Sequence, residues 1–156
     1  MTAESAFSRA KALDWIAQGP KQEVGASLRL NGTPWQREGC FVEPTVFDGA
    51  RNDMQIAREE IFGPVLSIVP FKDEDDTVLQ GNDTTYGLSA AGWTRDISRA
   101  HKMLRALKAG RLWIKTFGES DPAMAFGGYK QPGWGREFGQ ESIAAYTQTK
   151  SVMVRM

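Results

Sequence analysis

Cys40 is the only cysteine of the 156-residue chain, and His101 is its only histidine. A single cysteine is a candidate catalytic nucleophile, because a thiolate attacks carbonyl carbons readily. The alternative is a small core residue whose sulfur has no chemical role. His101 has no metal-binding or basic neighbour in the sequence, so we expect it to be structural, and the sequence predicts no metal site.

Two further stretches contain residues that suit a binding site. In "AREEIFGPVL" (57–66), Glu59 and Glu60 close a short helical segment, where the helix dipole disfavours carboxylates. They either hold a ligand hydroxyl or lie at a solvated helix end, and the local sequence favours neither alternative. Residues 117–139 form a long irregular segment rich in glycine and aromatic residues. Loops of this length inside compact domains are usually functional.

The composition indicates which partners the chain does not bind. Nineteen basic and nineteen acidic residues give a formal net charge of zero, so no overall field favours nucleic acid or an anionic membrane. The N-terminal sequence lacks the apolar core of a signal peptide, and no stretch reaches membrane-spanning length. We therefore expect a cytoplasmic protein with no nucleic-acid or membrane partner.

Apolar periodicity predicts alternating strands and helices. Helices are predicted at 6–17, 73–83 and 96–109, and strands at 26–30, 65–71, 86–94 and 111–115. "CFVEPTVF" (40–47) is expected to be an edge or bent strand because Pro44 interrupts it, and the 65–71 strand is expected to be buried. This order is typical of βαβ units and predicts an α/β fold with a three-layer parallel sheet.

The predicted helix over 96–109 has Asp96 as its cap and Gly110 as its stop. Its basic residues resemble a phosphate-binding row, but the apolar spacing places them on the solvent side. The basic residues are Arg99, Lys102, Arg105 and Lys108, and the predicted buried stripe is Ile97, Ala100, Leu104 and Leu107.

Several motifs, in order and spacing, resemble the aldehyde dehydrogenase superfamily. They are "GCFVEPTVF" (39–47), "EEIFGPV" (59–65), "TTYGLSAAGWTRD" (84–96), "AGRLWIK" (109–115) and "FGGYKQPGWGREFG" (126–139). The final "AYTQTKSVMVRM" resembles the C-terminal strand of that family. The resemblance extends from about Phe7 to Met156.

The resemblance implies which parts of the enzyme are present. Family members attack an aldehyde with a cysteine thiolate, transfer a hydride to NAD(P)+ and hydrolyse the thioester. That cysteine, the general-base glutamate, the oxyanion-hole asparagine and the dinucleotide-binding domain all belong upstream of this chain. Cys40 is therefore not the catalytic nucleophile. Residues 1–145 are expected to be a partial catalytic domain, and residues 146–156 an assembly strand.

The resemblance also assigns cofactor residues. Glu60 matches the carboxylate that holds the ribose hydroxyls on the nicotinamide side, and Phe62 matches the aromatic residue that contacts the nicotinamide end. The parent cofactor is NAD or NADP, and the resemblance does not choose between them. Because the phosphate-holding elements are absent, we expect this chain alone to bind nucleotide very weakly or not at all.

On the substrate side, Phe126, with Phe117 and Ser120 nearby, matches the loop that lines the aldehyde pocket. Glu137 matches a glutamate implicated in proton relay, and is expected to be a vestige of that relay here. The resemblance does not identify the aldehyde.

Three residues depart from the family pattern. Lys115 stands where relatives usually have asparagine, Ala125 replaces a usual proline, and Pro132 replaces a usual serine. Proline fixes φ and removes a backbone donor, so the last two changes alter loop stiffness. The three together are consistent with drift in a gene no longer selected for dehydrogenation.

The expected function is that of a C-terminal fragment of an NAD(P)-dependent aldehyde dehydrogenase, inactive alone. Two alternatives remain: a free-standing binding or oligomerisation module, and a decayed remnant. A homodimer formed through the terminal strand (148–156) is the expected assembly, and a separate chain with the N-terminal half is another possible partner.

Overall fold

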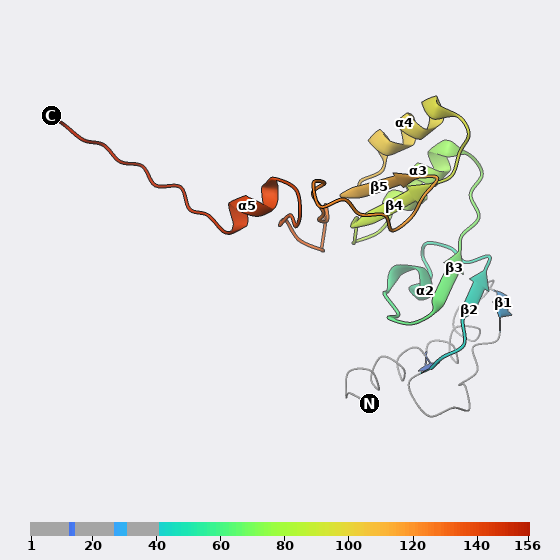
Figure 1. Ribbon diagram of the computed structural model, residues 1–156. Coiled ribbons are helices and arrows are strands. Elements are labelled where there is room, and N and C mark those ends of the chain that lie inside the picture. Colours follow the sequence, from blue (N-terminus) through green and yellow to red (C-terminus); the bar gives the residue numbers. More distant parts are fainter. Residues whose placement is uncertain (1–12, 15–26, 31–40) are drawn as a thin grey trace. The chain divides into compact units, whose positions relative to one another are not determined.

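The computed structural model describes residues 13–14, 27–30 and 41–156 (Figure 1). Cys40 and most of the predicted helix over 6–17 lie outside these residues. The chain divides into two compact units, residues 1–73 and 74–156, and each is described by itself. Both units contain parallel strands together with helices, which confirms the predicted α/β class.

The first unit contains a three-stranded sheet in the order β1-β2-β3. The strands are β1 (Ser27–Leu30), β2 (Thr45–Asp48) and β3 (Val65–Ile68). β2 pairs antiparallel with β1 and parallel with β3, and the short helix α2 (Gln55–Arg58) lies between β2 and β3 in the sequence.

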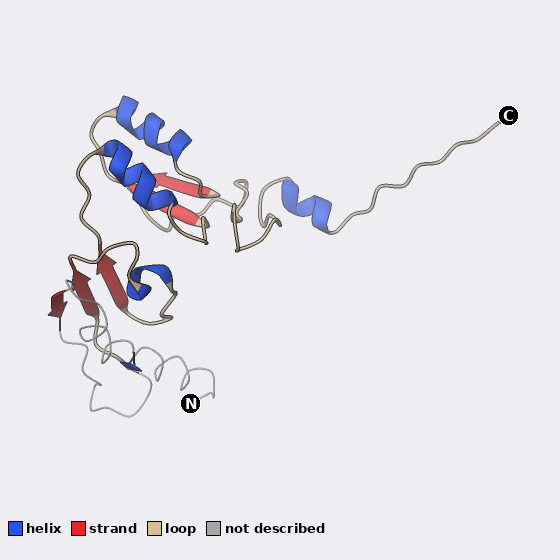
Figure 2. Ribbon diagram, turned by 180° about the vertical axis from the view of Figure 1, so that it is seen from behind, coloured by secondary structure: helices blue, strands red, loops and turns tan. Residues whose placement is uncertain are grey.

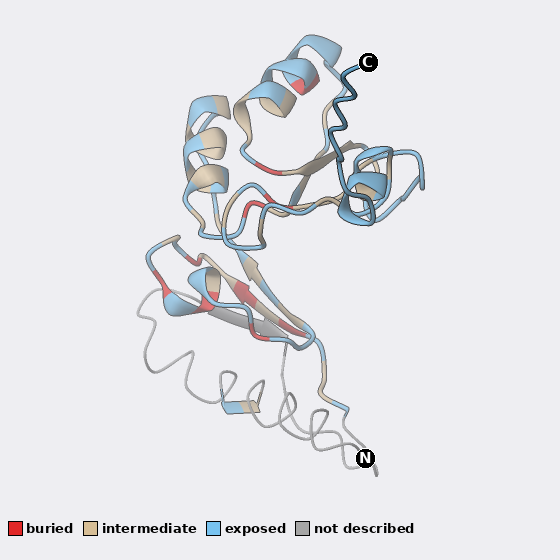
Figure 3. Ribbon diagram, turned by 90° about the vertical axis from the view of Figure 1, so that its left-hand side faces the viewer, coloured by how far each residue is buried: buried red, intermediate tan, exposed pale blue. Residues whose placement is uncertain are grey.

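β2 is the central strand of this sheet, so the expectation of an edge strand was wrong. Pro44 precedes the first residue of the strand and removes no bond from the ladder. The next residue, Thr45, donates its N–H to the Pro64 carbonyl at 2.8 Å. Phe47 is fully buried and packs with Ala50, Met54 and Ile56, which form the core of this unit (Figure 3).

β3 is less buried than its apolar sequence indicates. Leu66 is 58% exposed and Ile68 44% exposed, while Val65 packs against the Phe47 core. The expectation of a fully buried strand was therefore wrong, because alternate residues of β3 point away from the core.

The second unit contains a parallel strand pair and two longer helices (Figure 2). Its elements are α3 (Glu74–Asn82), β4 (Ser89–Gly92), α4 (Ile97–Ala106), β5 (Arg111–Ile114) and α5 (Glu141–Ala145). In the register, Ser89 lies opposite Arg111 and Gly92 opposite Ile114. The strands predicted at 86–94 and 111–115 are confirmed.

The two ends of α4 are fixed by side chains. Asp96 is the N-cap, and its carboxylate accepts from Ser98 N at 2.8 Å and Arg99 N at 3.2 Å, as predicted. The helix ends at Ala106, three residues before the predicted end. Asn82 enforces this end, because its side chain donates to the Ala106 carbonyl at 2.9 Å and accepts from Lys108 N at 2.7 Å.

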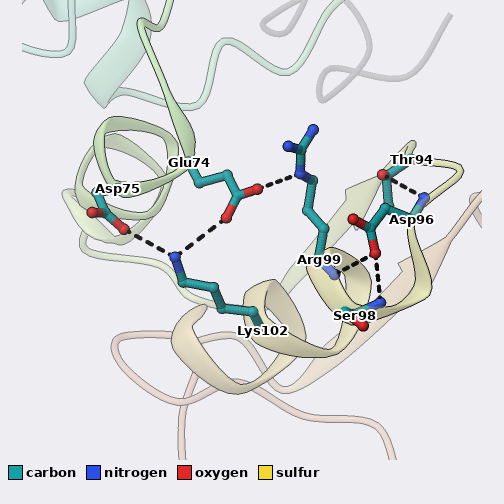
Figure 4. A network of polar contacts seen from close by, with 7 residues as sticks. All are labelled: Glu74, Asp75, Thr94, Asp96, Ser98, Arg99 and Lys102. Atoms are coloured by element: carbon teal, nitrogen blue, oxygen red, sulfur yellow. Dashed lines mark hydrogen bonds and ion pairs between the residues drawn. The ribbon is translucent and has the colours of Figure 1, made fainter.

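The basic face of α4 pairs with acidic residues in the first turn of α3 (Figure 4). Arg99 forms an ion pair with Glu74, and Lys102 Nζ donates to Glu74 at 3.3 Å and to Asp75 at 3.4 Å. These hydrogen bonds, first that of Glu74, raise the pKa of the Lys102 ammonium. The predicted solvent-side position of the basic residues is confirmed, but Ile97 is 68% exposed, so its place in the buried stripe was wrong.

The C-terminal residues 147–156 follow α5 without forming a strand in the described part of the chain. Val152, Met153 and Val154 are all highly exposed. The assembly strand stays a prediction, since a strand requires a partner chain. Across the described ranges, no helix is long and apolar enough to cross a membrane.

Replacing Asp96 with alanine removes the acceptor for two N–H groups at the start of α4. We expect Asp96→Ala to lower the free energy of unfolding of the second unit by about 1 kcal/mol. Urea unfolding followed by far-UV circular dichroism measures the change. Asp96→Asn keeps an acceptor oxygen and is the matched control, so an equal loss in both variants would contradict the capping role.

Candidate functional site

The predicted site residues lie in both units. Glu60 and Phe62 belong to the first unit, and the second contains Phe117, Ser120, Phe126 and Glu137. The structure brings the residues of each group together within their own unit.

Glu60 and Phe62 line one open hollow of about 400 Å³. It is formed by residues 52–69, where α2 ends and β3 begins. Its polar members are Asn52, Glu59, Glu60 and Ser67, and no lysine or arginine is among the described residues that line it. Carboxylate and amide oxygens accept hydrogen bonds from hydroxyl groups, whereas phosphates require cations or backbone donors. The hollow therefore suits the hydroxyl-bearing part of a ligand.

The carboxylates follow the helix as predicted. α2 ends at Arg58, and Glu59 is its C-cap residue with an extended backbone. The Glu59 side chain accepts from Gln55 Nε2 at 2.7 Å, which ties this carboxylate back to the helix. Glu60, the next residue, is exposed at the rim of the hollow.

Phe62 has an unusual backbone conformation for a bulky residue. Its φ is 54°, in the left-handed region that favours glycine. Its side chain is 66% exposed, so burial of the ring does not stabilise this conformation. Strained residues of this kind cluster at ligand sites, where the strained backbone places the side chain for contact with the ligand.

In the second unit, Arg111 at the start of β5 contacts the predicted aldehyde loop at two points and the ring of Phe126. Its guanidinium donates to Ser120 Oγ at 3.3 Å and to the Met124 carbonyl at 3.2 Å. The same group lies 4.5 Å from the centre of the Phe126 ring and 6.0 Å from the centre of the Trp113 ring. Arg111 thus links Ser120 and Phe126, two of the residues that the resemblance places at the pocket.

Trp113 holds the beginning of the same loop. Its indole N–H donates to the Glu119 carbonyl at 2.9 Å. Its ring lies 5.3 Å from that of Phe117, at 58° between the planes. Arg111 and Trp113 are two positions apart on β5, so they lie on the same face of the strand.

Phe126 and Glu137 are joined by an isolated antiparallel bridge. Phe126 N donates to the Glu137 carbonyl at 2.7 Å, and Glu137 N donates to the Phe126 carbonyl at 2.8 Å. The adjacent Arg136 donates to the Gly128 carbonyl at 3.0 Å and lies 5.9 Å from the centre of the Tyr129 ring. The backbone pairing therefore fixes the predicted relay residue beside the predicted pocket residue.

The sequence interpretation missed Arg111 and Trp113 as site residues, because it assigned residues 111–115 only to a strand. An arginine and a tryptophan two positions apart on a short strand, followed by a polar loop, were the available signal.

Lys115 has a φ of 61° at the end of β5, and its N–H donates to the Gly92 carbonyl at 2.9 Å. Asparagine adopts this conformation more readily than lysine does. The structure thus gives a physical reason for the asparagine that relatives are expected to have here, and Lys115 is a strained replacement.

The described part of the chain contains no candidate metal site. No group of three or more histidine, cysteine, aspartate or glutamate residues is arranged there to hold a metal ion. His101 lies exposed on α4.

A model of the aldehyde dehydrogenase family matches residues 3–152, which is nearly the whole chain. The chain belongs to the aldehyde dehydrogenase family. It is 43% identical over 144 residues to an aldehyde dehydrogenase of Davidiella tassiana, and 43% identical over 146 residues to aldehyde dehydrogenase 1A1 of Gallus gallus. These alignments cover 92% and 94% of this chain but only 29% and 28% of the relatives.

Solved structures of aldehyde dehydrogenases have the same fold over this portion. An indole-3-acetaldehyde dehydrogenase mutant of P. syringae, in complex with NAD+ and IAA, matches with a TM-score of 0.88 and 42% identity. An aldehyde dehydrogenase of Mycobacterium tuberculosis complexed with NAD+ matches with a TM-score of 0.87 and 40% identity. Both matches cover 96% of this chain, and 30% and 31% of the solved chains. The family resemblance inferred from the motifs is confirmed, and this family member spans less than a third of the proteins that it matches.

Relief of the strain at Lys115 is measurable. We expect Lys115→Asn to raise the free energy of unfolding of the second unit by about 1 kcal/mol, because the left-handed region costs most L-residues about that much. Thermal or urea unfolding measures the gain. Lys150→Asn, the same exchange in the exposed C-terminal segment, should leave stability unchanged. A loss of stability in Lys115→Asn would contradict the strain argument.

Proposed function

We propose that this chain is the C-terminal part of an NAD(P)-dependent aldehyde dehydrogenase whose complete form oxidises an aldehyde to a carboxylic acid. The observation that supports it most is the hollow at residues 52–69, which Glu60 and the strained Phe62 line together. The family membership and the neighbours solved with NAD+ support the same proposal.

The hollow fits one end of a dinucleotide. Glu60 accepts hydrogen bonds from the ribose hydroxyls, and Phe62 contacts the nicotinamide ring and limits its movement. The cofactor, when bound, supplies the hydride acceptor. Since the described lining contains neither lysine nor arginine, the phosphates must be held by residues outside this hollow.

On the aldehyde side, Phe117, Ser120 and Phe126 form the wall that contacts the substrate. Phe117 is 70% exposed, so its ring is available for contact with an apolar group. Glu137 is held beside Phe126 by the backbone bridge, at the place of the relay of which it is a vestige. Neither hollow nor loop contributes a thiol, and we propose that the chain alone does not oxidise aldehydes.

A graft into a complete enzyme tests this proposal. The portion of the P. syringae indole-3-acetaldehyde dehydrogenase that this chain matches is replaced with residues 1–156. We expect NAD+-dependent aldehyde oxidation by the graft. Glu60→Gln should raise the KM for NAD+ about tenfold, because a neutral amide is a weaker acceptor than a carboxylate. Glu141→Gln, the same exchange at an exposed position outside the hollow, is the matched control and should have little effect.

The isolated chain is the second control. It should show no NAD(P)+-dependent oxidation above background, and Cys40→Ala should change nothing. Its Kd for NAD+ should be about 1 mM or weaker, which corresponds to roughly −4 kcal/mol. The proposal would be contradicted if the isolated chain bound NAD+ with micromolar affinity or showed cysteine-dependent turnover. A folded graft that binds NAD+ but does not oxidise aldehyde would also contradict it.

We also propose that the terminal segment 148–156 pairs two copies of the chain. Val152 is 75% exposed and Val154 78% exposed, and both lie on the same side of an extended segment. An unpaired segment of this kind offers backbone donors and acceptors to a second chain, and a two-fold contact closes without leaving a new edge.

Removal of the segment should abolish the dimer. Light scattering on the intact chain is expected to give the mass of a dimer, and a version that ends at Ala145 that of a monomer. Val152→Thr/Val154→Thr keeps the β-branched shape and removes apolar surface, so it should weaken the dimer without removing the backbone pairing. A monomer with the intact segment, or a dimer without it, would overturn this assembly.

A further inference from the structure

Burial does not hold the predicted aldehyde loop, residues 116–125, in place. Residues 117–124 are all exposed, with Phe117 at 70% and Met124 at 60%. A segment with so little buried apolar surface opens easily unless specific contacts fix it. Within the loop, Ala123 N donates to Asp121 Oδ1 at 2.8 Å and Met124 N donates to the Asp121 carbonyl at 2.9 Å, which shapes one turn but does not attach it to the rest of the unit.

Gly139 N donates to the Pro122 carbonyl at 2.9 Å and the Trp113 indole donates to the Glu119 carbonyl, and each attaches one point of the loop. Arg111 attaches more points of it than either. It reaches the middle of the loop at Ser120, the end of the loop at Met124, and the ring of Phe126 just beyond the loop. Its donors diverge from a planar group, so one side chain joins points that are several residues apart. β5 pairs with β4 along its whole length, and Arg111 therefore extends from a fixed backbone.

Arg111 has no ion pair in the described ranges, and its guanidinium there contacts a hydroxyl, a carbonyl and two aromatic rings. Its positive charge therefore acts on aromatic faces and neutral acceptors and on no carboxylate, so charge alone does not explain how it holds the loop. Arginine differs from lysine at this position in its planar shape, its separated donors and its stacking on Phe126. A lysine carries the same charge but does not combine these three features.

We propose that Arg111 is the positioning residue of the aldehyde loop: it holds Ser120 and Phe126 where they contact substrate, while Trp113 holds Phe117. Arg111 acts through these side chains and does not itself touch the reacting atoms. The functional meaning of this role rests on the proposed function, but the geometric role does not.

The test uses the intact chain without aldehyde or nucleotide, so its outcome is independent of the proposed enzyme activity. The signature is hydrogen exchange of the Trp113 indole N–H, which donates to the Glu119 carbonyl in the loop. In ¹⁵N-labelled protein this resonance is identified by its loss in Trp113→Phe. We expect Arg111→Lys to speed its exchange about tenfold, since the loop then opens more often.

Chymotrypsin provides a second readout, because cleavage after the exposed Phe117 reports the same opening. We expect cleavage there to be several times faster in Arg111→Lys. Arg105→Lys, at an exposed position in the last turn of α4, is the matched control and should behave as the unchanged chain. Far-UV circular dichroism checks that both variants keep their helices.

Ser120→Ala keeps the test decisive if Arg111→Lys does not fold. Ser120 is exposed, and its replacement removes only the hydroxyl acceptor of Arg111, so the unit should remain folded. A two- to threefold faster indole exchange is expected, which is smaller than the effect of losing all the Arg111 contacts. The positioning role would be overturned if a folded Arg111→Lys variant showed unchanged indole exchange and unchanged cleavage. If the arginine variant does not fold, unchanged indole exchange in Ser120→Ala would overturn it.

Discussion

The second unit depends on the direct contact of two backbone segments at Gly110 and Gly127. A Cβ atom on Gly110 would overlap the Gly127 carbonyl oxygen, so any side chain would force the segments apart. Beside this contact, Gly110 N donates to the Leu88 carbonyl at 3.1 Å and Tyr129 N donates to the Gly87 carbonyl at 3.1 Å. The start of β5, the start of β4 and the segment after the aldehyde loop are thereby joined at one place.

This glycine contact also sets the geometry of the site. Arg111 directly follows Gly110, and Phe126 directly precedes Gly127, so the backbone contact fixes both side chains at their roots. The Arg111 guanidinium lies 4.5 Å from the centre of the Phe126 ring as a result. The loop leaves from the end of β5 and returns at Phe126, so both of its ends are attached to fixed backbone. A few specific hydrogen bonds, from Arg111, Trp113 and Gly139, then hold an exposed loop.

The features that sequence predicted well are local ones. The Asp96 cap and the helix predicted over 73–83 depend on residues close together in sequence, and both were found. The position of Pro44 relative to the ladder and the exposure of Ile97 depend on neighbours distant in sequence, and both predictions were wrong. Arg111 was missed for the same reason, since its partners lie 9 and 13 positions further along the chain. Family motifs predicted the site residues, and only the fold shows that β5 contacts Phe117, Ser120 and Phe126.

Backbone strain gives an independent reason to place chemistry where the motifs place it. In the described part of the chain, three residues other than glycine have φ in the left-handed region: Phe62 at 54°, Lys115 at 61° and Phe138 at 58°. Phe62 is a predicted cofactor residue, Lys115 immediately precedes the aldehyde loop, and Phe138 follows Glu137. The conformation costs an L-residue about 1–2 kcal/mol, so it persists only where the surrounding structure enforces it. The φ angles are properties of the backbone and do not depend on motif similarity. The three residues with positive φ therefore support the same two groups of predicted site residues independently of the motifs. Each unit therefore maintains backbone strain beside its own group of predicted site residues.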